Sequence, residues 1–145
     1  MELIGPSVVV LMRQLNVFLG RHIREANMTA SELMYLAPLY EEDGLTQERL
    51  SAVLAVNKAA TARIVRKLES KNLVLRRTQM DDRRSKRIWL TPQAKALEPT
   101  IRGLRDEWDA YVTQGMTDEE VSFLERRLAH MAERAKQLNA TQANE

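Results

Sequence analysis

Cysteine is absent from the 145 residues of this chain, which excludes disulfides, zinc fingers, iron–sulfur clusters and thiol catalysis. With only five glycines and four prolines, few positions interrupt regular structure, so long helices are expected. The longest apolar run, from Ser7 to Met12, ends at Arg13 and is far shorter than the roughly 20 residues that span a bilayer. The basic stretch and cleavage site of a signal peptide are also missing. We therefore expect a soluble, cytoplasmic protein without membrane association.

Charge is abundant in the sequence, and it is unevenly distributed. The segment from Asn57 to Arg87 holds eleven basic and three acidic residues, a net charge of +8. The remainder holds eleven basic and seventeen acidic residues, a net charge of −6. A concentrated basic block on an acidic body is typical of a protein that binds a polyanion. A solvated charged face is the alternative, and local structure has to distinguish between the two.

Two helices are expected before residue 45. Apolar spacing predicts the first over residues 6–25, with Pro6 at the first position, where its missing N–H costs nothing. The width of its apolar stripe indicates burial on more than one side. The second helix is opened by a capping box that runs from Thr29 to Glu32. Pro38 lies inside this helix and is expected to kink or shorten it.

A second pair of helices follows closely. Thr46 is the expected N-cap of a third helix that ends near residue 55, and Asn57 is the expected N-cap of a fourth over residues 58–70. Helical spacing gives the fourth helix an inward face made of Thr61, Ala62, Val65 and Leu68. Its other side chains point elsewhere, namely Lys58, Ala59, Ala60, Arg63, Arg66 and Lys67.

A β-hairpin is expected after the fourth helix. Its strands are predicted at residues 73–78 and 87–90, with residues 79–86 as a long basic tip. The third and fourth helices then form a helix-turn-helix, and the hairpin is its wing. A helix fits the major groove of DNA, while a basic tip reaches the adjoining minor groove, whose negative potential attracts arginine. The predicted fold class is mainly α with a small β-hairpin (α+β), and it favours double-stranded DNA as the polyanion.

The two ends of the chain are expected to form a helical dimerisation region. Thr91 caps a fifth helix, and a second capping box at Thr117 opens a sixth, whose last six or seven residues are expected to fray. With the first helix, they carry more apolar surface than one small lobe covers. We therefore predict a homodimer built from residues 6–26 and 92–139, beside a DNA-binding lobe at residues 29–91. Its two recognition helices would lie about 34–36 Å apart.

Three stretches of the sequence carry a family resemblance. They are Leu45–Leu50, Thr61–Val74 and, most specifically, Asp82–Thr91 with the sequence DRRSKRIWLT. The chain resembles the MarR family of transcriptional regulators, and its SlyA-type branch in particular, over nearly all of residues 1–145 as a single domain. The resemblance implies a homodimeric winged helix-turn-helix regulator, most often a repressor, on a pseudo-palindromic operator. It also implies release by a small aromatic or anionic effector.

The resemblance assigns roles to residues of the basic block. Arg63 is similar in position to an arginine that contacts the major groove, and Arg83 to a wing arginine that enters the minor groove. Asp82 resembles an acid that orients the wing by pairing with an arginine, and Arg84 is the expected partner. The wing departs from the common family pattern at residues 79–81, which lose one arginine and gain an acid. This departure is expected to weaken the grip on phosphate.

Further contacts to DNA are expected from the helix-turn-helix itself. The candidates for phosphate contacts are Lys58, Arg66 and Lys67. Thr46 and Gln47 open the third helix, whose free N–H groups can meet a phosphate. Ala60 is small enough to allow close approach to the groove. For each of these residues, the alternative is an ordinary surface or helix-forming side chain.

No catalytic, metal or cofactor site is expected. His22 and His130 lie on different predicted helices, and no nucleophile–base pair, phosphate loop or metal-ligand spacing is visible. An enzyme is therefore the weakest hypothesis, and a winged-helix protein–protein interaction module is the main alternative to a DNA-binding regulator. Core packing is expected for a set of methionines and aromatic residues, with an effector pocket as the alternative: Met12, Met28, Met34, Phe18, Tyr35, Tyr40 and Trp108.

Overall fold

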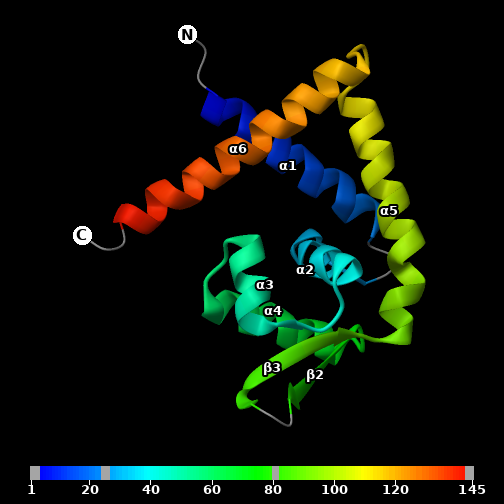
Figure 1. The fold of residues 1–145 in the computed structure, drawn as a ribbon. Coiled ribbons are helices and arrows are strands. Elements are labelled where there is room, and N and C mark those ends of the chain that lie inside the picture. The colour runs from blue at the N-terminus through cyan, green and yellow to red at the C-terminus, as the bar shows by residue number, and fades with distance from the viewer. Residues whose placement is uncertain (1–3, 24–26, 80–81, 143–145) are drawn as a thin grey trace. The chain divides into compact units, whose positions relative to one another are not determined.

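The computed structural model describes residues 4–23, 27–79 and 82–142; the side chains of 30, 79, 82–85, 141 and 142 lie outside that description. In chain order its elements are α1 (Ile4–His22), α2 (Ala30–Glu41), β1 (Leu45–Thr46), α3 (Gln47–Leu54), α4 (Lys58–Ser70), β2 (Val74–Gln79), β3 (Asp82–Leu90), α5 (Pro92–Val112) and α6 (Asp118–Gln142), as labelled in Figure 1. The predicted fold class, mainly helical with a small antiparallel β element, is confirmed.

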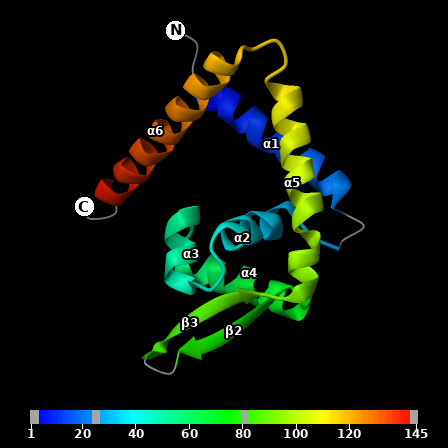
Figure 2. The same ribbon diagram turned by 45° about the vertical axis from the view of Figure 1, so that its right-hand side comes forward.

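Residue contacts divide the chain into two units, Met1–Trp108 and Asp109–Glu145. The first unit holds α1 to α4, the sheet and most of α5. Figures 1 and 2 both show its β2–β3 hairpin at the end away from α1, with α2, α3 and α4 between them. The second unit holds the last turn of α5 and the whole of α6.

Side-chain caps set the helix starts of the lobe, as the sequence predicted. Thr29 accepts a hydrogen bond from the backbone N–H of Glu32, whose carboxylate accepts one from the Thr29 N–H, each at 3.2 Å. Thr46 caps α3 and Asn57 caps α4 through the same kind of side-chain acceptor. Between these two helices Ala55 adopts a left-handed conformation, with φ of 53°. The caps are therefore encoded locally, whereas the left-handed Ala55 is held against its own steric preference by the helices on either side.

The first two helices differ from their predicted bounds. α1 begins at Ile4, so Pro6 lies in its first turn, where the backbone N–H groups have no helical acceptor and proline is tolerated. It ends at His22, so Ile23 lies outside the helix, and the last two residues of the predicted span, 24 and 25, lie outside the described residues. α2 continues through Pro38 to Glu41, so the expected shortening at the proline does not occur.

The sheet has three antiparallel strands in the order β1-β3-β2, of which the two-residue β1 was not predicted. β1 pairs with β3 through Leu45 opposite Ile88. The predicted long loop over residues 79–86 is wrong, because β3 already begins at Asp82. Backbone pairing at the end of a two-stranded ribbon requires no buried face, so the polar side chains there gave no strand signal.

The core of the first unit joins the lobe to parts of α1 and α5. Its fully buried apolar side chains are Leu36, Leu39, Leu50, Val65, Leu68, Leu73, Val74, Ile88 and Ala94. Leu19 on α1 and Leu104 on α5 pack into the same cluster. Core packing is confirmed for Met28 and Tyr35, and Phe18 and Tyr40 are partly buried against the core.

Several apolar side chains remain at the surface. Met12 and Met34, which were expected in the core, are exposed. Residues 4–14 of α1 are exposed throughout, so the burial on several sides that its wide stripe predicted does not occur within one chain. α6 extends to Gln142, beyond its predicted end near residue 139. Among the residues that the structure describes, no helix has the length and apolar character needed to cross a membrane.

Candidate nucleic-acid interface

The two faces of α4 differ sharply in burial. Thr61, Ile64, Val65 and Leu68 are buried, whereas Lys58, Arg63, Arg66 and Lys67 are all exposed. The inward face was predicted correctly except that Ile64 was missed and Ala62 is only half-buried. A one-residue error of this kind is expected, because 3.6-residue periodicity leaves flanking positions ambiguous. The helix therefore presents a cationic face to solvent while its other face is held in the core.

The exposed cations of α4 are not neutralised by ion pairs with the acidic side chains that the structure describes. In the described part of the chain, none of Lys58, Arg63, Arg66 or Lys67 forms an ion pair. The one acidic residue on the helix, Glu69, is paired with Arg76 of β2. The positive potential of the helix is therefore available to an external anion.

The C-terminal end of α4 is anchored to α2. The ammonium of Lys71 lies 2.8 Å from the carboxylate of Glu32 and also donates to the backbone carbonyl of Asn27. Glu32 is almost wholly buried, and its carboxylate also accepts from the backbone N–H of Thr29. A buried hydrogen bond between the hydroxyls of Tyr35 and Thr61 joins the middle of the same two helices. These contacts fix the position of α4 on the lobe.

Thr46 and Gln47, which were predicted to contact DNA at the start of α3, contribute their side chains less directly to this surface. The Thr46 hydroxyl is occupied as the N-cap, accepting from the backbone N–H of Arg49 at 3.1 Å. Gln47 is half-buried, and its Oε1 is enclosed without a hydrogen-bond partner among the described residues. Ala60, in the first turn of α4, is also half-buried. Because the Thr46 hydroxyl serves as the cap and the Gln47 oxygen is enclosed, the backbone N–H groups at this helix start are the better candidates to meet an anion.

For the wing, the structure describes the backbone of both strands but only some of the side chains. Asp82, Arg83 and Arg84 lie on β3, but their side chains are outside the described residues, so the expected pairing of Asp82 with Arg84 stays a prediction. Nearer the base of the hairpin, Arg77 and Lys86 are exposed. The basic character of the hairpin therefore extends from its tip toward its base.

Sequence reasoning missed the contacts at the base of the wing. The Asp43 carboxylate accepts from the backbone N–H of Leu90 at 2.8 Å, which ties the turn after α2 to the end of β3. The Arg87 guanidinium donates to the carbonyl oxygen of Gly44 at 2.7 Å. Gly44 has φ of +79°, and the ring of Trp89 lies against it. The sequence signal was a glycine after three acidic residues, which identifies a turn but not its partner.

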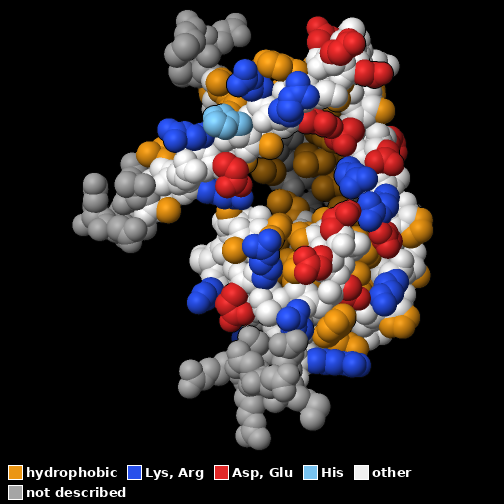
Figure 3. All heavy atoms as spheres, viewed as in Figure 1, with side chains coloured by type: hydrophobic (Ala, Val, Ile, Leu, Met, Phe, Trp, Pro, Cys, Tyr) orange, Lys and Arg blue, Asp and Glu red, His pale blue; other side chains and the backbone are white. Residues whose placement is uncertain are grey.

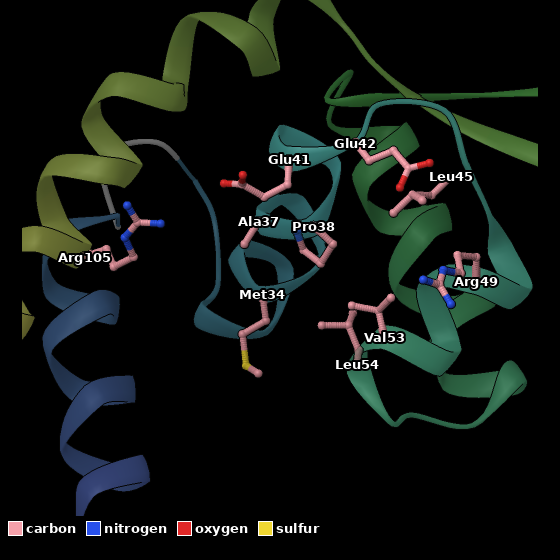
Figure 4. Close-up of a pocket in the computed structure, with 10 residues that line it drawn as sticks. All are labelled: Met34, Ala37, Pro38, Glu41, Glu42, Leu45, Arg49, Val53, Leu54 and Arg105. Carbon is pink, nitrogen blue, oxygen red and sulfur yellow. The ribbon is translucent and has the colours of Figure 1, made fainter. Parts of the chain in front are cut away.

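A cavity of about 510 Å³ opens between α2, α3 and α5 (Figure 4). Its walls are mostly apolar, and Figure 4 shows Met34 of α2 in the middle, with Val53 and Leu54 of α3 to one side and Arg105 of α5 to the other. Glu41 and Glu42 line it together with Arg49 and Arg105, which gives two charges of each sign. Figure 3 likewise shows acidic, basic and hydrophobic side chains side by side on the face of the lobe that it presents. This volume is in the range of small-molecule sites.

Among the described residues, neither histidine belongs to a cluster that could bind a metal ion. The Nδ1 of His22 lies 2.8 Å from the carbonyl oxygen of Phe18, one helical turn away, and the two rings pack against each other. No group of three or more histidine and acidic side chains in the described part of the chain is close enough to hold a metal ion.

Comparison with known proteins agrees with this architecture of a winged helix-turn-helix with a cationic second helix. The model of the MarR family matches residues 28–86. A MarR transcriptional regulator from Methanosarcina mazei Go1 is 31% identical, with 93% of this chain and 97% of that chain covered and a TM-score of 0.85. The uncharacterized HTH-type transcriptional regulator YybA of Bacillus subtilis (strain 168) is 24% identical over 131 residues, covering 88% of this chain and 87% of its own.

A MarR family transcriptional regulator from Listeria monocytogenes, solved with 26-mer DNA, has the same fold, with a TM-score of 0.90 and 23% identity over 94% of this chain and 91% of that chain. The chain belongs to the MarR family of transcriptional regulators. The resemblance carried by the helix-turn-helix and wing sequences is thereby confirmed.

Proposed function

We propose that this protein is a sequence-specific DNA-binding repressor that acts as a homodimer on a pseudo-palindromic operator in the cytoplasm. The observation that carries the proposal is the exposed cationic face of α4, which forms no ion pair with any described side chain and whose opposite face is fixed in the core. The likeness of fold to the Listeria regulator solved with DNA supports it. The proposal assigns the chain no catalytic role and no cofactor.

Each cation of α4 has a distinct role in this proposal. Arg63 contacts base edges in the major groove, where a bidentate arginine–guanine pair discriminates by about 1–3 kcal/mol. Lys58, Arg66 and Lys67 contact phosphates and supply affinity that does not depend on sequence. Ala60 allows the helix to approach the groove closely.

The remaining site residues act at the two flanks of α4. Arg83 and Arg84 enter or border the minor groove, with Asp82 orienting the wing by pairing with arginine. On the other flank, the N–H groups at Thr46 and Gln47 meet a backbone phosphate. The wing and α4 thus contact adjacent grooves from one lobe, which we place at residues 29–91.

Dimerisation is proposed from the apolar surface that the chain leaves uncovered. Val9 on α1 is 55% exposed and Leu128 on α6 is 45% exposed, and many of their apolar neighbours are exposed as well. Apolar side chains exposed in such number along a helix mark an interface between chains. We therefore propose that residues 6–26 and 92–139 form the dimerisation region. Val9→Asp is expected to shift the molar mass in sedimentation equilibrium toward the monomer, whereas Ser7→Asp, the same change of charge at a polar neighbour, leaves it dimeric.

The cavity between α2, α3 and α5 is the proposed effector site. Its apolar walls suit an aromatic ring, and Arg49 or Arg105 supplies a cation for a carboxylate. A ligand can shift the protein between two geometries only if it binds one of them better. Benzoate is therefore expected to weaken DNA binding, and neutral benzamide much less. A loss of the benzoate effect in Arg105→Gln would support this assignment, and equal effects of both compounds would contradict it.

The proposed function is tested by selecting duplexes from a random pool with the full chain. The expected result is an enriched sequence with two-fold symmetry and half-sites about one helical turn apart. Arg63→Ala should flatten the preference at one base pair in each half-site, whereas Lys67→Ala should weaken binding to all sequences alike. No enrichment, together with no binding to any duplex at low salt, would favour a protein–protein interaction module instead.

A further inference from the structure

Hydrogen bonds at Asp43 and Gly44 join the base of the wing to the turn between α2 and β1. The Asp43 carboxylate accepts from the N–H of Gly44 at 3.0 Å and from the N–H of Leu90 at 2.8 Å. The guanidinium of Arg87 donates to the carbonyl oxygen of Gly44 at 2.7 Å. The turn is therefore tied to β3 through Gly44, one residue before β1 begins.

Trp89 closes this junction from the outer face of the sheet. A Cβ atom added to Gly44 would lie 2.5–2.7 Å from three carbons of the Trp89 ring, which is closer than real Cβ atoms approach any neighbour. The positive φ of Gly44 also disfavours any other residue there. Glycine is thus required both by the backbone and by the ring that covers it.

The junction connects two parts of the proposed DNA surface. β1 pairs with β3 through Thr46 opposite Arg87, and Thr46 is also the N-cap of α3. A change in the direction of β3 is therefore transmitted directly to the start of the helix-turn-helix. At its other end, β3 carries the backbone of Arg83 and Arg84.

We propose that Trp89 is a positioning residue that fixes the direction of the wing relative to α4. By covering Gly44, its ring keeps β3 at one angle, so that the wing arginines and Arg63 engage adjacent grooves at the same time. Trp89 needs no contact with DNA for this. The proposal rests on the proposed function, because it concerns how the same DNA surface is assembled.

The test is a double-mutant cycle on affinity for a selected duplex. Trp89→Ala is expected to weaken binding by roughly fivefold to tenfold, a magnitude typical of coupled groups. In a background that carries Arg83→Ala and Arg84→Ala, the same substitution should change affinity less than about twofold, because no wing contact remains to be misplaced. Trp89→Phe keeps a flat ring over Gly44 and should restore most of the affinity.

Leu75→Ala is the matched control, because Leu75 lies directly opposite Trp89 on the same exposed face of the sheet. It is expected to leave affinity unchanged in both backgrounds. Thermal denaturation of each variant shows whether it is folded at the temperature of the binding assay. Equal weakening by Trp89→Ala with and without the wing arginines would overturn the proposal, and so would no weakening at all.

Amide hydrogen exchange in the absence of DNA separates this proposal from the proposed function. Trp89→Ala should accelerate exchange at the Leu90 N–H and along the β2–β3 ladder, while amides in the middle of α4 keep their protection. If the unaltered protein binds no duplex, the proposed function fails, and exchange alone decides whether Trp89 fixes the wing. Unchanged exchange at Leu90 would then refute it.

Discussion

The winged helix-turn-helix lobe and the long helices α1 and α6 differ in how far their apolar side chains are buried. In the lobe, Leu36, Leu50 and Ile88 have no exposed surface at all. On the long helices, Val9 and Leu128 keep about half of theirs. Because apolar surface removed from water is the main stabilising term, the core stabilises the lobe within one chain, whereas much of the apolar surface of the long helices stays uncovered there, as the proposed dimer requires.

The largest expected effect comes from substituting a leucine of each region. Leu68→Ala opens a cavity in the lobe core and should lower the free energy of unfolding by about 2–5 kcal/mol at any protein concentration. Leu128→Ala on α6 should instead act through association, so its effect on the melting temperature depends on protein concentration. Urea unfolding at two concentrations a hundredfold apart measures both. If the stability of both variants responded alike to protein concentration, the proposed difference between the lobe and α6 would be wrong.

The two regions should also differ in how much an ion pair contributes to stability. Lys71→Met leaves the buried carboxylate of Glu32 without its cation and should cost about 3 kcal/mol of stability. Lys136→Met removes the partner of Glu133 in an exposed pair on α6 and should cost less than about 0.5 kcal/mol. Chemical denaturation of both variants tests this. A Lys71→Met variant as stable as the unaltered protein would show that the pair does not anchor α4.

DNA binding should respond to cations of the lobe and not to those of α6. Arg63→Ala is expected to lower affinity for a selected operator by about 1–3 kcal/mol, with unchanged melting temperature because the side chain is exposed. Lys136→Ala removes the same charge from α6 and should leave affinity unaltered. Competition with a mutated operator distinguishes lost specificity from lost charge. An equal loss for both variants would place the DNA surface elsewhere.

The smallest expected effect is a pH dependence at the seam between α2 and α5. Burial, aided by the charge of Glu98, raises the pKa of Tyr40 to about 12, and the Tyr40 hydroxyl donates to the carbonyl oxygen of Ala94 at 2.7 Å. The folded protein retains this proton above pH 10, where the unfolded chain loses it. Stability should therefore fall as the pH rises from about 10 to 12. Tyr40→Phe should show a shallower fall across this range, and an identical pH profile would contradict the assignment.

Much of the lobe was predictable because its signals are local. Thr29, Thr46 and Asn57 each cap a helix within three residues of themselves, and the exposed face of α4 follows from helical periodicity. The resemblance that identified the family rests on the same short stretches. The fold class and the four exposed cations of α4 were therefore accessible from the sequence.

The junctions between elements were not predictable, because they join residues far apart in the chain. Lys71 meets Glu32 across 39 positions, and Asp43 meets Leu90 across 47. β1 is two residues long and is defined only by its pairing with β3, so it has no periodicity of its own. The wide apolar stripe of α1 predicted burial on several sides, but a stripe does not reveal whether the residues that cover it come from the same chain.

The salt dependence of DNA affinity tests the central claim most directly, since that claim is that the basic surface of α4 and the wing binds a double helix. Six phosphate contacts, from Lys58, Arg66 and Lys67 in each of two subunits, predict a log–log slope of roughly −5. Lys67→Ala should make the slope shallower by about two units, because each dimer loses two contacts. A binding constant that does not change with salt would contradict the account.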